Sequence, residues 1–347
     1  MNKQITRRGV QIVLGVLWLL DGALQSQHQM FTSSFANNVI APAAQNQPII
    51  ISSPMHFAVH LILLHPAIFN ACFALIQLAI GAAILWKKTT RYGLIASIIW
   101  GISVWIGGEG LAGMASGHAT LLMGAPGAAL LYAILSFGVM PLKPKGKQQD
   151  NYPAYWLVLV WAILWIGGSV FQLLPGQNSV IEVSDMVSGM SVGAPSWLAS
   201  LDNHAASAIN GLGRSTGSMS SAHSITSQVT IPSMAGMHMQ LHRAAPQTHN
   251  GYWFILLVVF IQLLIGVGVL YKGRWRKAAI GVGIVAALIY WVIGQSLGGY
   301  YSGLATDPNS GPLIVLLGIA VLGCNDLDNK LSQLYRKAEY LLVGKNS

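Results

Sequence analysis

The sequence predicts an all-α integral membrane protein with eight transmembrane helices, arranged as two tandem four-helix repeats. Three observations lead to this fold class. Of the 347 residues, 53% are hydrophobic and only 8% are charged, whereas globular proteins average roughly 25% charged residues. Apolar runs of about 20 residues, the length that crosses a bilayer, recur along the chain. Several motifs of the first half also return, in the same order, in the second half.

The apolar runs place four helices in each half. They cover about 9–25, 60–86, 92–108 and 120–140 in the first half, and 154–174, 251–271, 278–297 and 312–324 in the second. We interpret the first run as an anchor, because no small-residue cleavage site of a signal peptide follows it. Residues 26–55 carry no Lys or Arg and are predicted to form a polar loop, and 109–118 a short Gly-rich loop.

These helices define the domain boundaries. The prediction is a first repeat at 1–140, a basic cytoplasmic linker at 141–152, a second repeat at 153–324 with a long extracytoplasmic insertion at 175–250, and an amphipathic cytoplasmic tail at 325–347. Inside the insertion, apolar residues recur at helical spacing over 196–210, which predicts a short interfacial helix.

The basic residues set the predicted orientation. If the N-terminus is inside and the chain alternates sides, every Lys and Arg except Arg214 and Arg243 falls on one face. Such sorting follows the positive-inside rule. We therefore expect a multi-pass protein of the cell (plasma) membrane with both termini cytoplasmic. The net charge of +9 does not indicate nucleic-acid binding, because the positive residues lie in clusters between apolar runs.

The internal repeat supports the same helix count. Trp18 to Gln25 matches Trp165 to Gln172, and Ile76-Gln77-Leu78 with Gly81 matches Ile261-Gln262-Leu263 with Gly266. A third set matches at one constant offset: Trp105, Gly108, Leu111, Gly113, Gly117, Thr120 and Pro126 with Trp291, Gly294, Leu297, Gly299, Gly303, Thr306 and Pro312. Because each half has an even number of helices, the repeats are predicted to be parallel.

Histidines mark the predicted outer side. MHFAVH at 55–60 and MHMQLH at 237–242 are each followed by a further histidine, and all ten histidines fall on that side. Histidines four residues apart on a helix share one face, and thioether sulfur favours copper. The predicted ligands of copper, or of zinc as second choice, are His56, His60 and His65 in one copy, His238, His242 and His249 in the other, and Met55 and Met237 as optional soft ligands. Duplication of a polar loop that tolerates histidine is the alternative.

Ionisable and amide side chains inside the apolar runs form a second set of candidates. Asp21 and Glu109 lie near the outer ends of the first and third helices, where acids are functional candidates by default. Their repeat partners are Gly168 and Gln295, so the first half is the preferred active half. The alternative is that both acids are solvated at headgroup level. Gln25, Gln77, Gln262 and Gln295 either join helices by hydrogen bonds or line a polar pocket.

The stretches 18–25 and WIGGEGLAG at 105–113, with Gln77 and the four-helix unit, resemble the DoxX/DoxD-like membrane superfamily. The resemblance implies similarity to the small subunit of thiosulfate:quinone oxidoreductase or to redox partner proteins, and hence electron traffic to quinone. The thiol-dependent branch needs paired cysteines, and Cys72 and Cys324 form no such pair in the sequence. No catalytic residue carries over.

Three classes of function therefore stay open. The first is a membrane metalloprotein that binds copper or zinc on its outer face, for metal handling or redox chemistry. The second is a non-enzymatic accessory subunit that packs on other membrane subunits, or on a second copy of itself, through 175–250. The third is a small-solute transporter, with Asp21, Glu109 and the glutamines lining a polar cavity between the repeats. These classes include both an enzyme and non-enzymes.

Overall fold

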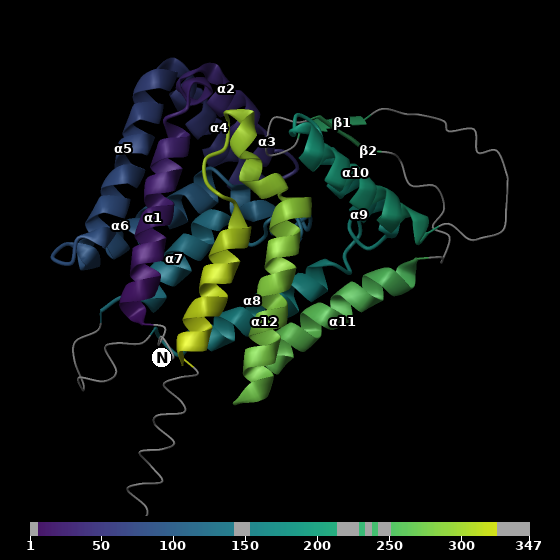
Figure 1. Cartoon of the computed structure of the whole chain (residues 1–347). Helices are drawn as coiled ribbons and strands as arrows, with labels where there is room; N and C mark the ends of the chain where they lie inside the picture. Colours follow the sequence, from purple (N-terminus) through teal and green to yellow (C-terminus); the bar gives the residue numbers. More distant parts are fainter. Residues whose placement is uncertain (1–5, 142–152, 214–228, 233–237, 242–250, 325–347) are drawn as a thin grey trace, which may run out of the picture.

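The computed structural model describes residues 6–141, 153–213, 229–232, 238–241 and 251–324 (Figure 1). This part of the chain is helical except for one antiparallel strand pair, β1 (Val229–Pro232) with β2 (His238–Leu241). Two predicted regions lie outside the described residues: the linker 141–152, except for its first residue, and the whole tail 325–347. Apart from this strand pair, the part of the chain that the structure describes confirms the predicted all-α fold class.

The first half has five longer helices. These are α1 (Arg7–Gln25), α4 (Ile49–Leu64), α5 (Pro66–Leu85), α6 (Thr90–Gly107) and α7 (Ala128–Gly138). Short helical turns fill the connections: η1 (His28–Phe31), α2 (Ser33–Phe35), η2 (Ala36–Ile40), α3 (Ala41–Ala43) and η3 (Gly110–Gly113). The chain enters α1 through a side-chain cap, in which the Thr6 hydroxyl accepts a hydrogen bond from the Gly9 N–H.

The second half repeats this order with a larger insertion. Its elements are α8 (Leu157–Phe171), α9 (Val180–Gly189), α10 (Ser196–Gly211), β1, β2, α11 (Tyr252–Gly268), α12 (Arg274–Ile289), η5 (Tyr290–Gly294), η6 (Ser296–Ser302) and a final helix, Ser310–Cys324, drawn in yellow in Figure 1. The helix expected at 196–210 is present as α10. The main core lies between α7, α8 and the final helix, where Leu131, Trp161 and Leu317 are fully buried.

Two expectations for the region before α5 were wrong. Residues 26–55 form a string of helical turns rather than an open polar loop, because Met30, Phe35 and Ile40 bury apolar surface in a cluster of their own. The helix expected over 60–86 is broken at His65, which ends α4 and begins α5 with φ −146° and ψ 69°. Pro66 causes the break, since a residue before proline avoids the α conformation.

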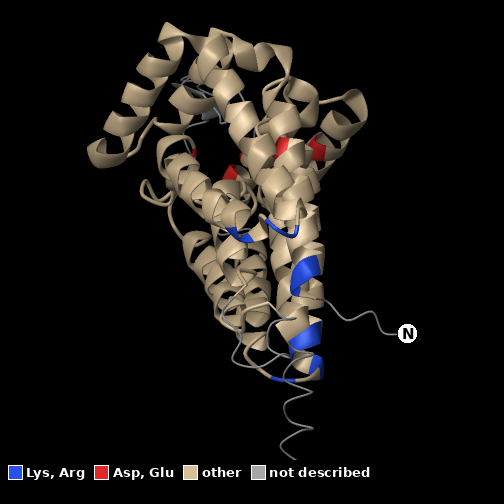
Figure 2. Ribbon diagram, turned by 90° about the vertical axis from the view of Figure 1, so that its left-hand side faces the viewer, with Lys and Arg blue, Asp and Glu red and all other residues tan. Residues whose placement is uncertain are grey.

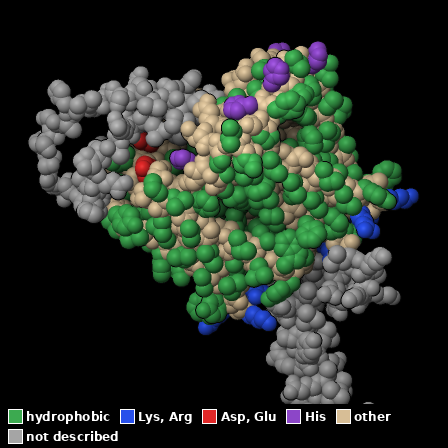
Figure 3. All heavy atoms as spheres, turned by 180° about the vertical axis from the view of Figure 1, so that it is seen from behind, with side chains coloured by type: hydrophobic (Ala, Val, Ile, Leu, Met, Phe, Trp, Pro, Cys, Tyr) green, Lys and Arg blue, Asp and Glu red, His purple; other side chains and the backbone are tan. Residues whose placement is uncertain are grey.

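Two helical stretches, Pro66–Leu85 and Arg274–Ser302, are long and apolar enough to cross a membrane. In Figure 2 the Lys and Arg residues lie toward one end of the described molecule and the Asp and Glu residues lie farther from it. Figure 3 shows histidines gathered at the opposite end, with hydrophobic side chains covering the surface between. We call these the basic end and the histidine end. Many large apolar side chains, such as Leu75, Ile163 and Phe260, are exposed on this surface.

Helix pairs in the two halves pack through matched glycines. A Cβ atom at Gly81 of α5 would lie 2.8 Å from the backbone oxygen of Gly15 in α1. A Cβ atom at Gly266 of α11 would lie 3.0 Å from the backbone oxygen of Ala162 in α8. Gly81 and Gly266 are partners in the sequence repeat, so both halves use the same position to bring their first and second membrane-type helices together.

The turns that follow α6 and η5 also share one backbone conformation. Positive φ angles occur in both copies at the same repeat positions: 56°, 57°, 50°, 76° and 78° at Gly110, Leu111, Ala112, Gly113 and Gly117, and 48°, 56°, 77°, 67° and 74° at Ser296, Leu297, Gly298, Gly299 and Gly303. Non-glycine residues with positive φ are uncommon. Their recurrence supports the tandem repeat predicted from the sequence.

The close approach of α1 and α5 gives a direct test. Gly81→Ala is expected to lower the free energy of unfolding by about 1–3 kcal/mol, because the new methyl group overpacks the helix contact. Gly281→Ala in α12 is the matched control: nothing lies within 4 Å of a Cβ atom there, so it is expected to be neutral or slightly stabilising. Denaturation of both purified variants in detergent measures the difference. Equal stability would contradict the packing described for α1 and α5.

Candidate functional site

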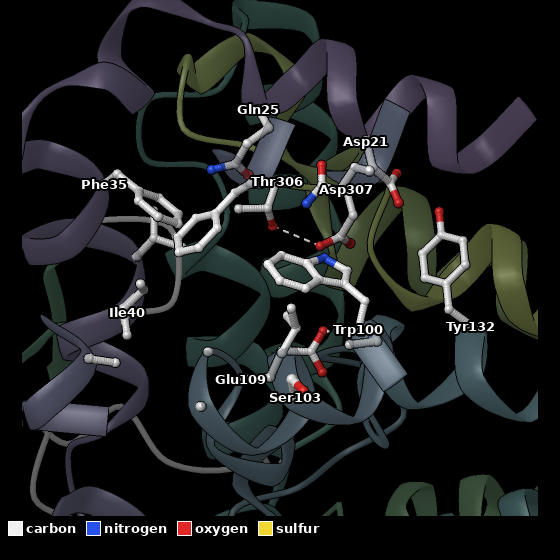
Figure 4. A pocket seen from close by; sticks show the side chains of 18 of the residues that line it. Asp21, Gln25, Phe35, Ile40, Trp100, Ser103, Glu109, Tyr132, Thr306 and Asp307 are labelled. Carbon is white, nitrogen blue, oxygen red and sulfur yellow. Dashed lines mark hydrogen bonds between the residues drawn. The ribbon is translucent and has the colours of Figure 1, made fainter. Parts of the chain in front are cut away.

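A cavity of about 300 Å³ lies in the first half, between the helix ends that point toward the histidine end (Figure 4). Its lining comes from α1, α2, η2, α4, α5, α6 and α7, and from the loop that precedes the final helix. Most of the lining is apolar or aromatic, including Phe35, Ile62, Phe73, Trp100 and Tyr132. A pocket of this size accommodates a small organic molecule.

Three carboxylic acids converge on this cavity, which we call the acidic cavity. Asp21 belongs to α1, Glu109 follows the end of α6, and Asp307 lies in the loop before the final helix (Figure 4). Atoms Oδ1 of Asp21 and Oε2 of Glu109 are buried and have no hydrogen-bond partner. No Lys, Arg or His occurs among the described residues that line the cavity. The buried Tyr132 hydroxyl lies across from the Asp21 carboxylate and interacts with it (Figure 4). The cavity therefore offers hydrogen-bond acceptors that the protein itself satisfies only in part.

The second oxygen of Glu109 and both oxygens of Asp307 are held in place by hydrogen bonds. Oε1 of Glu109 accepts the N–H of Ala129, 3.0 Å away, at the first turn of α7. A helix N-terminus favours an acceptor of this kind because its first N–H groups lack partners. The Asp307 carboxylate accepts the Thr306 hydroxyl and the Asn309 N–H, each at 2.7 Å. These contacts fix the two acids on different chain segments, and Oε2 of Glu109 lies against Gly127, where an added Cβ atom would clash with it.

Burial changes the acidity of the two acids that lie outside the helices. Removal from water, with a smaller contribution from the charge of Asp307, raises the pKa of Glu109 from 4.5 to about 8. Burial also raises the pKa of Asp307, and the hydrogen bonds from Thr306 and Asn309 oppose this rise. Near neutral pH, Glu109 therefore holds a proton that a positively charged group in the cavity could replace.

The predicted glutamines divide between the two halves. Gln25 and Gln77 line the cavity. The Gln25 amide donates to Asn70 Oδ1, and Asn70 Nδ2 donates back to the Gln25 backbone oxygen at 2.9 Å, so this pair joins α1 to α5. Oε1 of Gln77 is buried without a partner. Gln262 donates to the Tyr290 hydroxyl at 3.2 Å, outside the cavity.

Gln295, the repeat partner of Glu109, performs the same helix-capping role without a charge. Its Oε1 accepts the N–H of Gly311, 3.0 Å away, at the start of the final helix, and its Nε2 donates to the Leu121 backbone oxygen at 3.3 Å. Both oxygen and nitrogen of this amide are therefore satisfied within the protein. Of the six polar candidates predicted from the sequence, the acidic cavity gathers Asp21, Gln25, Gln77 and Glu109.

The first predicted metal cluster lies elsewhere, at the surface. His56 and His60 are exposed on α4, and His65 is exposed at the junction of α4 and α5. Met55 is fully buried in the cluster around Met30, on a different side of α4 from these histidines. Among the described residues, no three His, Cys, Asp or Glu side chains come close enough together to hold a metal ion.

The second predicted metal cluster is largely beyond the described chain. Only the backbone of His238 is described, in β2, while Met237, His242 and His249 lie outside the described residues. The histidine hypothesis therefore stays a prediction.

Sequence reasoning missed Asp307. The stretch from Asp307 to Pro312 matches a turn followed by a helix start, and Thr306 and Asn309 do form that turn. Its second role, as part of a cavity in the other half, depends on tertiary contacts. A signal was present in the repeat: at the constant offset, Asp307 corresponds to Leu121, and an acid facing an apolar partner is an unusual replacement.

No family model, no curated protein and no solved structure matches this chain. The function of the site must therefore be inferred from its own residues.

The state of Glu109 can be tested with N,N′-dicyclohexylcarbodiimide, which modifies protonated carboxyl groups in apolar surroundings. We expect Glu109 to be labelled at about pH 6 and labelling to decline with a midpoint near pH 8, because the reactive acid form disappears above its pKa of about 8. Peptide mass spectrometry measures the labelled fraction. Glu182, a capping residue at the start of α9, is the internal control, and equal labelling of both would contradict the assignment.

The same acid should make stability depend on pH. In the folded chain Glu109 keeps its proton up to about pH 8, whereas an unfolded chain loses it near pH 4.5. Raising the pH across this window therefore favours unfolding, by at most about 1.4 kcal/mol per pH unit for one proton. We expect the melting temperature of the wild type to decrease across the window and that of Glu109→Gln to decrease less. Parallel pH profiles for the two proteins would show that Glu109 has an ordinary pKa.

Proposed function

We propose that this protein is a polytopic membrane protein that binds a small organic cation in the acidic cavity, as a carrier of small solutes. The observation that carries the proposal is that Asp21 and Glu109, each with one buried oxygen that has no hydrogen-bond partner, both line a cavity whose described lining has no basic side chain. Leaving a buried acceptor without a partner costs about 1–3 kcal/mol. A ligand with a positively charged N–H donor would recover that free energy.

The membrane part of the proposal is supported by length, exposure and charge. Eight helical stretches of the described chain overlap the eight apolar runs of the sequence, and two stretches, Pro66–Leu85 and Arg274–Ser302, are long and apolar enough to cross a membrane. Exposed apolar side chains cover the surface between the basic end and the histidine end (Figure 3). On the positive-inside rule, the basic end is cytoplasmic and the acidic cavity opens toward the outer half of the bilayer.

The aromatic lining favours an organic cation. The cavity contains the rings of Trp18, Phe35, Phe73, Trp100 and Tyr132. Aromatic faces attract cations, by about 0.5–2 kcal/mol for each well-placed ring. A protonated amine with an apolar body fits both features, since its ammonium group meets the acids and its body meets the rings. The predicted copper or zinc site at the exposed histidines is a separate hypothesis and requires no residue of this cavity.

A quinone headgroup is a second candidate, favoured by a specific observation. The Trp100 indole N–H is buried without an acceptor, and Trp100 lines the largely apolar cavity. Together with the proton on Glu109, it offers donors that suit the carbonyl oxygens of a neutral quinone. The DoxX/DoxD resemblance implies the same ligand. The two candidates differ in charge, so one experiment separates them.

Thermal-shift and calorimetric titration of the purified protein in nanodiscs would test the proposal. The probes are a panel of aromatic monoamines that includes phenethylammonium, each paired with a neutral isostere such as phenethyl alcohol, and one short-chain quinone. We expect amines to bind and their neutral partners not to bind. Asp21→Asn should weaken amine binding about 10- to 100-fold, because a hydrogen bond to a charged group is worth about 1.5–3 kcal/mol.

Glu182→Gln is the matched control, because it removes one negative charge at a site where glutamine preserves the α9 cap. It should leave amine binding unchanged. Binding of the quinone with no binding of any amine would contradict the cation and favour the second candidate. Protein that binds no probe and purifies with stoichiometric membrane partners would instead indicate the accessory-subunit class.

A further inference from the structure

One side of the acidic cavity is supplied by the second half of the chain. Residues 303–307 leave η6 and lie against the first half, where Leu304 packs on the cluster around Met30. A Cβ atom at Gly303 would lie 3.0 Å from Cδ of Gln29. Thr306 and Asp307 then reach the cavity itself. We call 303–307 the second-half segment.

The corresponding segment of the first half, 117–121, lies against the second half. The Gly117 backbone oxygen accepts a hydrogen bond from Gln177 Nε2 at 3.2 Å, and the Leu121 backbone oxygen accepts one from Gln295 Nε2 at 3.3 Å. The Leu121 side chain sits directly over Gly168 of α8, where an added Cβ atom would lie 2.3 Å from its Cδ1.

The two segments are therefore exchanged between the halves. They occupy the same positions in the sequence repeat, since Gly117 corresponds to Gly303, Thr120 to Thr306 and Leu121 to Asp307 at the constant offset. The loops that follow them meet, because a Cβ atom at Gly124 would lie 2.3 Å from Oδ1 of Asn309. Each half thus receives one segment from the other. At the last position of the segment, the first half receives Asp307 and the second half receives Leu121.

This exchange makes the two repeats chemically unequal. In the first half, the exchanged residue is Asp307, which faces Asp21 and Glu109 (Figure 4). In the second half the same three positions hold Leu121, Gly168 and Gln295. Leu121 is only 3% exposed, belongs to the main core and covers Gly168, the repeat partner of Asp21. An apolar side chain occupies the position where the first half has a carboxylate beside a cavity.

We propose that Asp307, delivered across the repeat by the second-half segment, contacts the ligand and determines its charge specificity, and that Leu121 closes the equivalent position in the second half, so that each chain has one ligand site. This inference deepens the proposed function and rests on it. It also explains why the three acids meet at only one of the two equivalent places in the duplicated fold.

The test places at position 307 the leucine that the chain has at the equivalent position 121. Asp307→Leu puts at this position the side chain that closes the other one, and it should abolish phenethylammonium binding, by more than about 100-fold in affinity. It should also reduce carbodiimide labelling of Glu109, because the larger leucine side chain takes up cavity space beside Glu109. Asp307→Asn, which keeps the size of the side chain, should retain the labelling and weaken amine binding about tenfold. The wild type should bind one amine per chain in calorimetric titration.

The outcomes separate this inference from the proposed function. Wild-type affinity in Asp307→Asn, or two amines per chain, would overturn the inference while leaving the cation-binding function in place. If no amine binds the wild type, the proposed function fails. Labelling then tests whether a leucine closes the position: full carbodiimide labelling of Glu109 in a folded Asp307→Leu protein would show that it does not. Should Asp307→Leu not fold, the amine affinity of Asp307→Asn still tests the role of Asp307, and the number of amines bound by the wild type still tests for a single site.

Discussion

One physical constraint governs the site in the first half: it buries carboxylic acids beside a cavity whose described lining has no basic side chain. Glu109 caps α7 with one oxygen and leaves the other unpaired, and Asp21 also has an unpaired oxygen. A charged carboxylate in such surroundings is costly, so a proton or another cation must accompany it. A proton on Glu109 meets this requirement, as the raised pKa of about 8 indicates. Entry of an ammonium group would remove the need for that proton, so ligand binding and proton release should be linked.

The packing of the helices makes this burial possible. Gly81 lets α5 approach α1 closely. The residues with positive φ at Gly110 to Gly113 reverse the chain direction, so that the start of α7 lies beside Glu109. The second half uses the same glycine position and the same turn, yet Gln295 there needs no counter-charge. At these positions the backbones agree and the side chains differ, so the chemical difference between the two turns lies in a few side chains.

Much of the site could be predicted from the sequence, since Asp21, Gln25, Gln77 and Glu109 were identified as polar groups in apolar helices and do line one cavity. The preference for the first half also followed from the repeat, because Gly168 and Gln295 replace its acids. Asp307 could not be placed, since its role comes from an exchange of segments that local patterns do not encode. The histidines were visible as a motif, but His56 and His60 lie exposed on α4, and no three metal-ligand side chains come together among the described residues.

The central claim is that a ligand's positive charge replaces a proton held by the buried acids of a single cavity. Calorimetric titration of the wild-type protein with phenethylammonium at about pH 7, in two buffers of different ionisation enthalpy, measures this directly, because protons released on binding add the heat of buffer protonation. The account predicts one binding event per chain whose apparent enthalpy differs between the buffers by the heat of protonating up to one buffer molecule, and whose affinity rises with pH up to about 8. Enthalpies and affinities that do not change with buffer or pH would contradict it.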